Sequence, residues 1–147
     1  MNTKVTMHFT IEELYASKTA KDKGINNMPS VREMVNLVYL AAYVLEPLRV
    51  AMGKPIRISS GYRCERLNKA VGGVYNSQHL KGQAADIDIQ GDMAFGRKIF
   101  DHIRDHLPFD QLIWEHSKSG TYWVHVSFVY PDFGKNRKNV INNLEKK

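Results

Sequence analysis

The stretch SQHLKGQAAD, residues 77–86, places His79 seven residues before Asp86, an aspartate within a β-rich run. Side chains alternate from Ala84 to Ile89, so the carboxylate of Asp86 lies on the face opposite the aliphatic side chains. Gly82 permits a tight turn before this strand, and the two alanines allow close packing. We therefore expect the loop to fold His79 over the open face of the strand, where imidazole and carboxylate could converge on one metal ion.

A catalytic zinc site needs a third protein ligand and an open position for water, because the metal acidifies that water and polarises a carbonyl. Cys64 is the only cysteine, so thiolate clusters and internal disulfides are excluded, and the ligands must be His, Asp or Glu. Our candidate is His125 in the β-rich run 122–129, where alternation places it opposite the apolar side chains. A structural histidine in a strand is the alternative.

The other histidines offer weaker metal-site candidates. His102 and His106 lie four residues apart on a predicted helix, which puts both rings on one face. The segment lacks the glutamate that follows the first histidine in the helical zinc-peptidase motif, so we interpret both as residues at the edge of an apolar stripe. His8 and His116 have no supporting pattern and are expected at the surface.

The remaining pattern predicts an α+β domain, a small and mostly antiparallel sheet with flanking helices. Apolar spacing and capping boxes at Thr10 and Ser30 predict helices over residues 10–17, 31–52, 63–71 and 92–107. Pro47 is expected to kink or divide the second helix. Strands are expected over residues 55–59, 84–89, 111–115 and 122–129. Residues 18–29 and 72–83 are expected to be loops.

Three motifs in one order make the sequence resemble the D-Ala-D-Ala carboxypeptidase and dipeptidase group of zinc peptidases, which includes phage endolysins. They are SGYR at residues 60–63, the Ser-x-His-x-x-Gly-x-Ala-x-Asp pattern at residues 77–86, and WVH at residues 123–125. The resemblance implies a hedgehog/DD-peptidase-like fold. It also implies Zn²⁺ bound by His79, Asp86 and His125, with peptidoglycan stem peptides or D-alanyl peptides as substrates.

The resemblance assigns roles to two further side chains. The arginine of the SGYR motif points into the cleft in this family, so Arg63 is expected to be catalytic and substrate-binding. Its guanidinium would stabilise the carbonyl oxygen as it becomes an oxyanion; a surface salt bridge is the alternative. Ser77 would support His79 or bind the substrate, and a turn-forming serine is equally compatible with the sequence.

The sequence departs from many relatives at the general base. They carry an acidic residue three positions before the last histidine of the motif, where this chain has Tyr122. Glu115 is our candidate for the catalytic general base, and Asp88 is the alternative. A five-residue hairpin loop at 117–121 would put Glu115 on the face of His125, whereas a six-residue loop would turn it away.

We therefore expect residues 1–147 to form a single zinc peptidase domain that cleaves peptides of the cell wall, in lysis or remodelling. A D-Ala-D-Ala carboxypeptidase or an endolysin-like enzyme encoded by a phage or prophage fits this description. The alternative is a catalytically silent zinc domain that binds cell-wall or protein ligands. The missing acid at Tyr122 is the feature that supports this alternative.

The charge, length and hydrophobic content of the chain limit which partners and which cellular location we expect. The net charge is +6, and residues 131–147 hold half of the excess, so we expect a basic C-terminal tail exposed to solvent. No motif indicates specific nucleic-acid binding. A chain of 147 residues with 43% hydrophobic content can bury a core as a monomer. Without a signal-peptide core or an apolar run of about 20 residues, we expect synthesis in the cytoplasm, no membrane span, and action on the wall after release.

Overall fold

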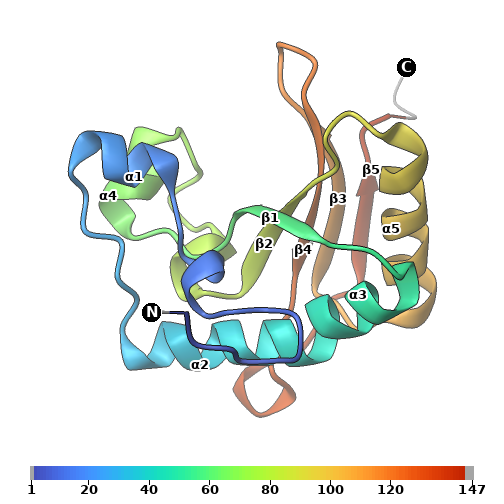
Figure 1. The fold of residues 1–147 in the computed structure, drawn as a ribbon, viewed down its shortest axis with the longest axis horizontal. Helices are drawn as coiled ribbons and strands as arrows, with labels where there is room; N and C mark the ends of the chain where they lie inside the picture. Colours follow the sequence, from blue (N-terminus) through green and yellow to red (C-terminus); the bar gives the residue numbers. More distant parts are fainter. Residues whose placement is uncertain (1, 145–147) are drawn as a thin grey trace.

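The computed structural model describes residues 2–144 and confirms the predicted α+β architecture, a five-stranded sheet with helices around it (Figure 1). The strand order is β1-β2-β4-β3-β5. All neighbouring strands pair antiparallel except β3 and β5, which are parallel. The strands are β1 (Arg57–Ser60), β2 (Ala84–Asp88), β3 (Gln111–His116), β4 (Tyr122–Ser127) and β5 (Asn139–Asn142).

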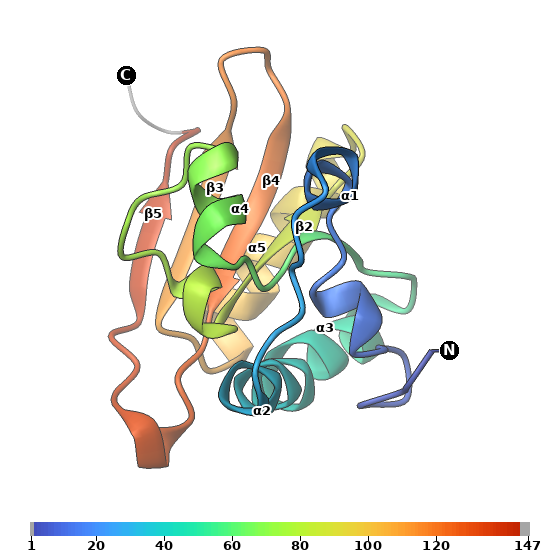
Figure 2. The ribbon, with the colours of Figure 1, turned by 90° about the vertical axis from the view of Figure 1, so that its left-hand side faces the viewer.

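The helices lie on both sides of this sheet. The α-helices are α1 (Lys18–Lys23), α2 (Val31–Leu40), α3 (Glu46–Met52), α4 (Glu65–Ala70) and α5 (Met93–His106). A π-helical segment, η2 (Ala41–Leu45), joins α2 to α3. The 3-10 turns are η1 (Glu12–Leu14), η3 (Gln78–Lys81) and η4 (Pro131–Phe133). Figure 2 shows α4 in front of the sheet and α5 behind it, so the two faces of the sheet have different coverings.

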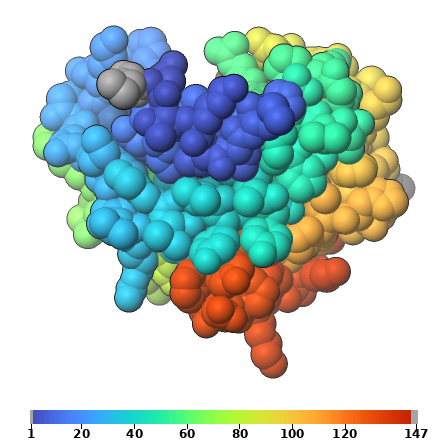
Figure 3. Space-filling view, turned by 60° about the horizontal axis from the view of Figure 1, so that its bottom comes forward, coloured from blue at the N-terminus to red at the C-terminus, as the bar shows by residue number. Residues whose placement is uncertain are grey.

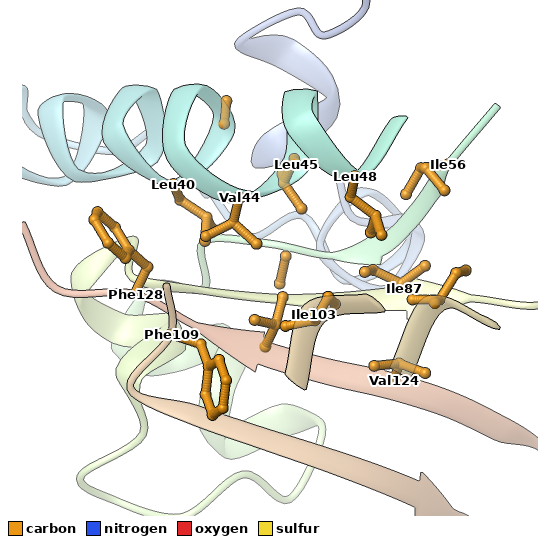
Figure 4. Packing of buried hydrophobic residues seen from close by; sticks show 14 of the residues in the cluster. Leu40, Val44, Leu45, Leu48, Ile56, Ile87, Ile103, Phe109, Val124 and Phe128 are labelled. Carbon is orange, nitrogen blue, oxygen red and sulfur yellow. The ribbon is translucent and has the colours of Figure 1, made fainter. Parts of the chain in front are cut away.

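The hydrophobic core fills the space between one face of the sheet and the helices α2, α3 and α5 (Figure 4). Strand residues on this face include Ile87 and Val124, which are direct cross-strand partners and fully buried. Leu48 of α3 and Ile103 of α5 are buried in the same cluster. Because strand side chains alternate, the polar residues next to Ile87 and Val124 must point to the opposite face. That face carries the site described below.

Residues 31–52 form one helical run, as predicted, and the run changes geometry just before Pro47. The π turn η2 ends at Leu45, two residues ahead of the proline. Proline lacks an N–H and its ring collides with the carbonyl four residues earlier in a regular α-helix, so a wider turn at this place relieves the collision. The capping box predicted at Ser30 and Glu33 is present at the start of α2.

This 22-residue run, Val31–Met52, is long and apolar enough to cross a membrane by length and composition alone. The core helix of a globular domain passes the same test. Here one face of the run is fully buried in the core, which favours the second interpretation. The buried residues on that face are Leu37, Leu40, Ala41, Val44, Leu45 and Leu48.

The N-terminal helix prediction is wrong in extent. Thr10 and Glu13 make both capping contacts, with the Thr10 N–H donating to Glu13 Oε2 at 2.9 Å and the Glu13 N–H donating to Thr10 Oγ1 at 3.3 Å. Only the single 3-10 turn η1 follows, because the next cap at Ser17 begins a separate helix. The capping box therefore marked a real turn and not a helix up to residue 17.

The loop predicted at residues 18–29 contains the helix α1. Ser17 accepts a hydrogen bond from the Ala20 N–H at 3.1 Å, and Gly24 closes the helix in the left-handed region at φ 64°. Ala20 is the only buried residue of α1, so the helix has no apolar stripe for a periodicity argument to detect. A Ser cap and a Gly stop were the available signals.

Residues 131–144 of the predicted basic tail are exposed or half-buried, as expected, but they also contain strand β5. Strand β5 pairs with β3 from Gln111↔Asn139 to Trp114↔Asn142. The segment before β5 packs on α2 (Figure 3). The rings of Tyr39 and Tyr130 are stacked with centroids 3.8 Å apart. Residues 145–147, the rest of the predicted tail, lie outside the described residues. The net charge gave no sign of this strand, because the basic residues Lys135, Arg137 and Lys138 precede it and β5 itself contains none.

Candidate metal centre

His79 is held by the 3-10 turn η3, which lies inside the predicted loop at residues 72–83. Ser77 Oγ accepts the N–H of His79 at 3.2 Å and caps the turn. Gly82 ends it at φ 72°, and a Cβ at this position would lie 2.5 Å from the carbonyl oxygen of Glu33. Both the backbone conformation and the close approach of α2 therefore require glycine. The imidazole of His79 is 2% exposed.

A hydrogen bond selects the ring nitrogen that His79 presents to the site. Its Nδ1 lies 2.7 Å from the carbonyl oxygen of Gly61, and a carbonyl can only accept, so Nδ1 carries the proton. Nε2 then presents a lone pair. This atom is buried and has no hydrogen-bond partner among residues 2–144. A buried imidazole lone pair with no hydrogen-bond donor beside it has the chemistry of a metal ligand.

Asp86 and His125 meet this nitrogen from the neighbouring strands β2 and β4, where they are direct cross-strand partners. Asp86 Oδ1 lies 2.9 Å from His125 Nδ1 and 3.3 Å from His79 Nε2. One ligand atom from each of the three residues lies within 4.8 Å of the other two. The structure thus brings together the three residues predicted as metal ligands.

The protonation states fit a metal site. Burial by itself would raise the pKa of Asp86, but the two histidines at its side hold that pKa well below its usual range, through charge and hydrogen bonds. The carboxylate is therefore ionised at neutral pH. Two imidazoles and one carboxylate, with one side open to a cleft, form a donor set of the kind that catalytic zinc takes.

The cleft beside these ligands has a volume of about 590 Å³. Arg63 lines it, and its backbone N–H donates to the carbonyl oxygen of His79 at 3.0 Å, so the SGYR motif and η3 are joined directly. Burial lowers the pKa of the guanidinium, while Asp86 and Glu115 raise it through their charges. Arg63 thus lines the cleft within electrostatic reach of both carboxylates, and its catalytic role stays a prediction.

Residues 7–127 match the family Peptidase M15. The chain belongs to the peptidase M15 family. A stretch of 44 residues is 48% identical to the zinc D-Ala-D-Ala carboxypeptidase of Streptomyces albus G. The matched stretch covers 29% of this chain and 17% of that relative. The chain therefore spans well under two thirds of the curated relative it matches. The family predicted from the three motifs is confirmed.

The structure places Glu115 of this M15 chain where the hairpin argument predicted. The loop has five residues, and His116↔Tyr122, Glu115↔Trp123 and Ile113↔His125 are cross-strand partners. Glu115 therefore shares the face of His125 and lines the cleft. Burial raises the pKa of its carboxyl and Asp86 adds to this effect, whereas His125, His79 and Arg63 lower it.

Asp88, the alternative base, is turned to other partners. Its carboxylate lies 3.5 Å from Arg57 Nε and accepts the N–H of Gln90 at 2.9 Å. It lines a separate hollow near Gly91 and Tyr122, not the metal cleft. This placement favours Glu115 for the role of base. Ser77 lines the cleft and also caps the turn of His79, so both of the interpretations given for it are compatible with the structure.

The remaining histidines lie away from the cleft. The rings of His102 and His106 face each other on α5 with centroids 4.9 Å apart, and no third ligand joins them among residues 2–144. His116 is exposed, as predicted. His8 is exposed too, but its Nδ1 lies 2.6 Å from a carboxylate oxygen of Glu46, so it ties the N-terminal segment to α3.

Three residues that line or support the cleft escaped the sequence analysis: Gln78, Asp110 and Arg137. Asp110 is 2% exposed and accepts hydrogen bonds from both of the others. Gln78 and Arg137 line the cleft. The one local signal was a lone aspartate directly before a strand, and nothing in the sequence reveals a partner 27 positions away.

Proposed function

We propose that this M15 protein is a zinc peptidase that hydrolyses peptide bonds in peptidoglycan stem peptides or D-alanyl peptides, in lysis or remodelling of the cell wall. The observation that carries the proposal is the convergence of His79, Asp86 and His125 at a cleft that Arg63 and Glu115 also line. The name of the Streptomyces albus G relative supports D-alanyl peptides as the substrate class.

Zinc held by the three ligands would acidify the attacking water and polarise the scissile carbonyl. The residues of the chain supply the other requirements. Arg63 presents a permanently charged donor to the carbonyl oxygen as negative charge develops on it. Its Nε is buried and has no hydrogen-bond partner among residues 2–144.

Glu115 supplies the proton transfer. A carboxylate in the cleft takes a proton from the attacking water and passes it to the nitrogen of the leaving amine. Burial raises the pKa of Glu115 above its usual range, which makes it a stronger base than an exposed glutamate. A glutamate from the β3 side of the hairpin can thus replace the acid that many relatives carry at the position of Tyr122.

The decisive experiment is digestion of purified peptidoglycan by the zinc-loaded protein. We expect new amino groups to appear, a chelator to stop their release, and added zinc to restore it. Mass spectrometry of the muropeptides then identifies the bond, because loss of a terminal D-alanine indicates a carboxypeptidase and cleavage within the stem indicates an endopeptidase. Stoichiometric zinc with no release from any wall or D-alanyl peptide would favour the silent binding domain.

A further inference from the structure

The cleft contains a second arginine, Arg137, which the proposed mechanism does not use. It lines the same cavity as His79 and His125 but lies just ahead of strand β5. It also lies beyond residues 7–127, the part of the chain that matches the M15 family. Its role is therefore a property of this chain that family membership alone does not specify.

Arg137 is fixed in place by the buried carboxylate of Asp110. Nε of Arg137 donates to Oδ1 at 3.1 Å and Nη2 donates to Oδ2 at 2.8 Å, a two-pronged contact. The backbone N–H of Arg137 donates to Oδ1 at 2.7 Å, and the N–H of Asn139 donates to the carbonyl oxygen of Asp110 at 2.9 Å. The arginine is thus held through both its side chain and its backbone.

The same carboxylate links Arg137 to the metal centre. Gln78, the residue before the ligand His79, donates from Nε2 to Asp110 Oδ2 at 3.0 Å. Asp110 therefore fixes the distance between η3 and the segment just before β5. Because Gln78 and Arg137 both line the cleft, this contact sets the spacing between the metal ligands and the guanidinium.

The exposure of the two partners is unequal. The side chain of Asp110 is 3% exposed, whereas that of Arg137 is 62% exposed. The hydrogen bonds of the guanidinium within residues 2–144 use Nε and Nη2 on the side facing Asp110. The Nη1 edge remains for another partner, and a planar guanidinium can bind one carboxylate on each of two edges.

We infer that Arg137 is a substrate-binding residue that takes a carboxylate of the peptide held in the metal cleft. This inference rests on the proposed function and names an acidic peptide as its substrate class. A guanidinium fixed in advance loses little freedom when it binds, so its second edge can give a charge-assisted pair with the ligand. The carboxylate is either the C-terminal group of the peptide or an acidic side chain within it.

The test compares peptides that differ only in one carboxylate. The first pair is a D-alanyl peptide with a free C-terminus and the same peptide with a C-terminal amide. The second pair has an amidated C-terminus and differs by D-glutamate against D-glutamine within the chain. The ratio of kcat/KM within each pair measures the preference for a carboxylate at one position, and the pair that shows it identifies the source.

We expect the wild-type protein to prefer the carboxylate in one pair by roughly tenfold or more, and Arg137→Gln to reduce that ratio by about tenfold. Arg57→Gln is the matched control, because Arg57 is 66% exposed and paired with Asp88 but lines no part of the cleft. It should keep the wild-type ratio. An unchanged ratio in Arg137→Gln, or the same reduction in Arg57→Gln, would overturn the inference.

Loss of Arg137 removes charged donors from the buried Asp110, so a folding defect must be separated from a binding defect. The double variant Asp110→Asn with Arg137→Gln removes the buried charge as well, and we expect the same loss of preference from it. Retention of the wild-type ratio in the folded double variant would count against Arg137. Circular dichroism and zinc content check the fold of each variant.

A binding measurement separates this inference from the proposed function. Calorimetric titration of each zinc-loaded protein with the carboxylate and amide peptides, with Glu115→Gln added to both proteins to slow turnover, reports affinity with little hydrolysis. Carboxylate binding to the metal would occur in both proteins, so only the difference between wild type and Arg137→Gln is assigned to Arg137. Arg137-dependent binding without cleavage would reject the peptidase and keep the carboxylate site. Cleavage with equal affinities and ratios in both proteins would reject the carboxylate site and keep the peptidase.

Discussion

Asp86 and His125 are direct cross-strand partners on β2 and β4, and Asp86 Oδ1 lies 2.9 Å from His125 Nδ1. The metal centre therefore depends on strand register. A shift of one residue would turn one of the two ligands into the hydrophobic core, because adjacent side chains point to opposite faces. The buried pair Ile87 and Val124, directly next to these ligands, stabilises the register that the site needs.

His125→Ala should abolish stoichiometric zinc binding at neutral pH, because two remaining ligands rarely hold catalytic zinc. Metal analysis after dialysis measures this, and the zinc-dependent rise in melting temperature that we expect for the wild type should be absent from the variant. His106→Ala is the control, since it removes an exposed histidine of α5 and should keep one zinc per chain. Full zinc retention by His125→Ala would remove His125 from the ligand set.

Gly82→Ala should lower the free energy of unfolding by more than the roughly 1–2 kcal/mol that a left-handed alanine costs. The added Cβ would lie 2.5 Å from the carbonyl oxygen of Glu33, so α2 or η3 must shift. Gly53→Ala is a matched control, with φ 69° and open space around the new Cβ. Zinc affinity should fall only in Gly82→Ala, because η3 carries His79. Equal effects of the two variants on both stability and zinc would contradict this prediction.

Arg63→Lys should leave the zinc content unchanged but slow turnover by about 100-fold, because an ammonium lacks the planar donor fork. Steady-state kinetics on a D-alanyl peptide, with zinc measured in parallel, provide the test. Arg57→Lys, at an exposed ion pair outside the cleft, should keep the wild-type rate. Wild-type kinetics in Arg63→Lys would exclude a role for the guanidinium in the transition state.

Asp110 should contribute stability that depends on pH. Burial by itself would raise the pKa of this carboxyl, but hydrogen bonds from Arg137 and Gln78 lower it below its usual value. A depressed folded-state pKa means that the contribution is complete above the unfolded pKa of about 3.9 and is lost as the pH falls through the lower folded value. Asp110→Asn should therefore cost about 1–2 kcal/mol at pH 7, a modest figure because the partner Arg137 is exposed.

Denaturant unfolding of wild type and Asp110→Asn at several pH values measures that contribution. The difference between their free energies of unfolding should be constant above about pH 5 and should shrink at lower pH. A difference that stays constant down to pH 3, or that grows there, would show that the ionised carboxylate is not the source of the stability. Asp132→Asn is a control for an exposed aspartate in the same part of the chain.

The sequence was enough to predict the strands whose apolar and polar residues alternate. The strand bearing Asp86 and the strand bearing His125 follow from period-two patterns. The sequence left a five- and a six-residue hairpin loop open, and the structure has the five-residue loop that pairs Glu115 with Trp123. A tight turn and two strand faces made His79, Asp86 and His125 candidates for the metal ligands, and the resemblance to the zinc peptidases favoured His125 over a structural histidine. Strand alternation and turn residues are enough to predict a site when neighbouring segments of the chain determine where its side chains point.

The missed elements, α1 and β5, have no periodic pattern of apolar residues that would have revealed them. Helix α1 buries only Ala20, so it lacks an apolar stripe. Strand β5 is short and follows a basic segment, and its partner β3 lies more than twenty residues earlier. The contact between Asp110 and Arg137 depends on that pairing. The net charge alone places Arg137 in a basic tail, whereas its position is set by the carboxylate of Asp110, directly before the neighbouring strand β3.

Glu115→Gln should keep the fold and the zinc but lower turnover by about 100-fold or more, because the amide cannot accept the proton of the attacking water. The change is isosteric, and Glu115 is not among the three ligands, so circular dichroism and metal content should match the wild type. Asp88→Asn is the informative comparison. Its carboxylate pairs with Arg57 outside the cleft, so we expect little change in rate from that variant.

The pH profile of kcat/KM adds an independent measurement of the same role. The base must be ionised to act, so activity should fall as the pH drops through its pKa, and burial raises the pKa of Glu115 above that of an exposed glutamate. This acidic limb should be absent from the residual activity of Glu115→Gln and present in Asp88→Asn. If Asp88→Asn lost the activity and the limb while Glu115→Gln kept both, the general base would be Asp88, and the cleft position of Glu115 would have another purpose.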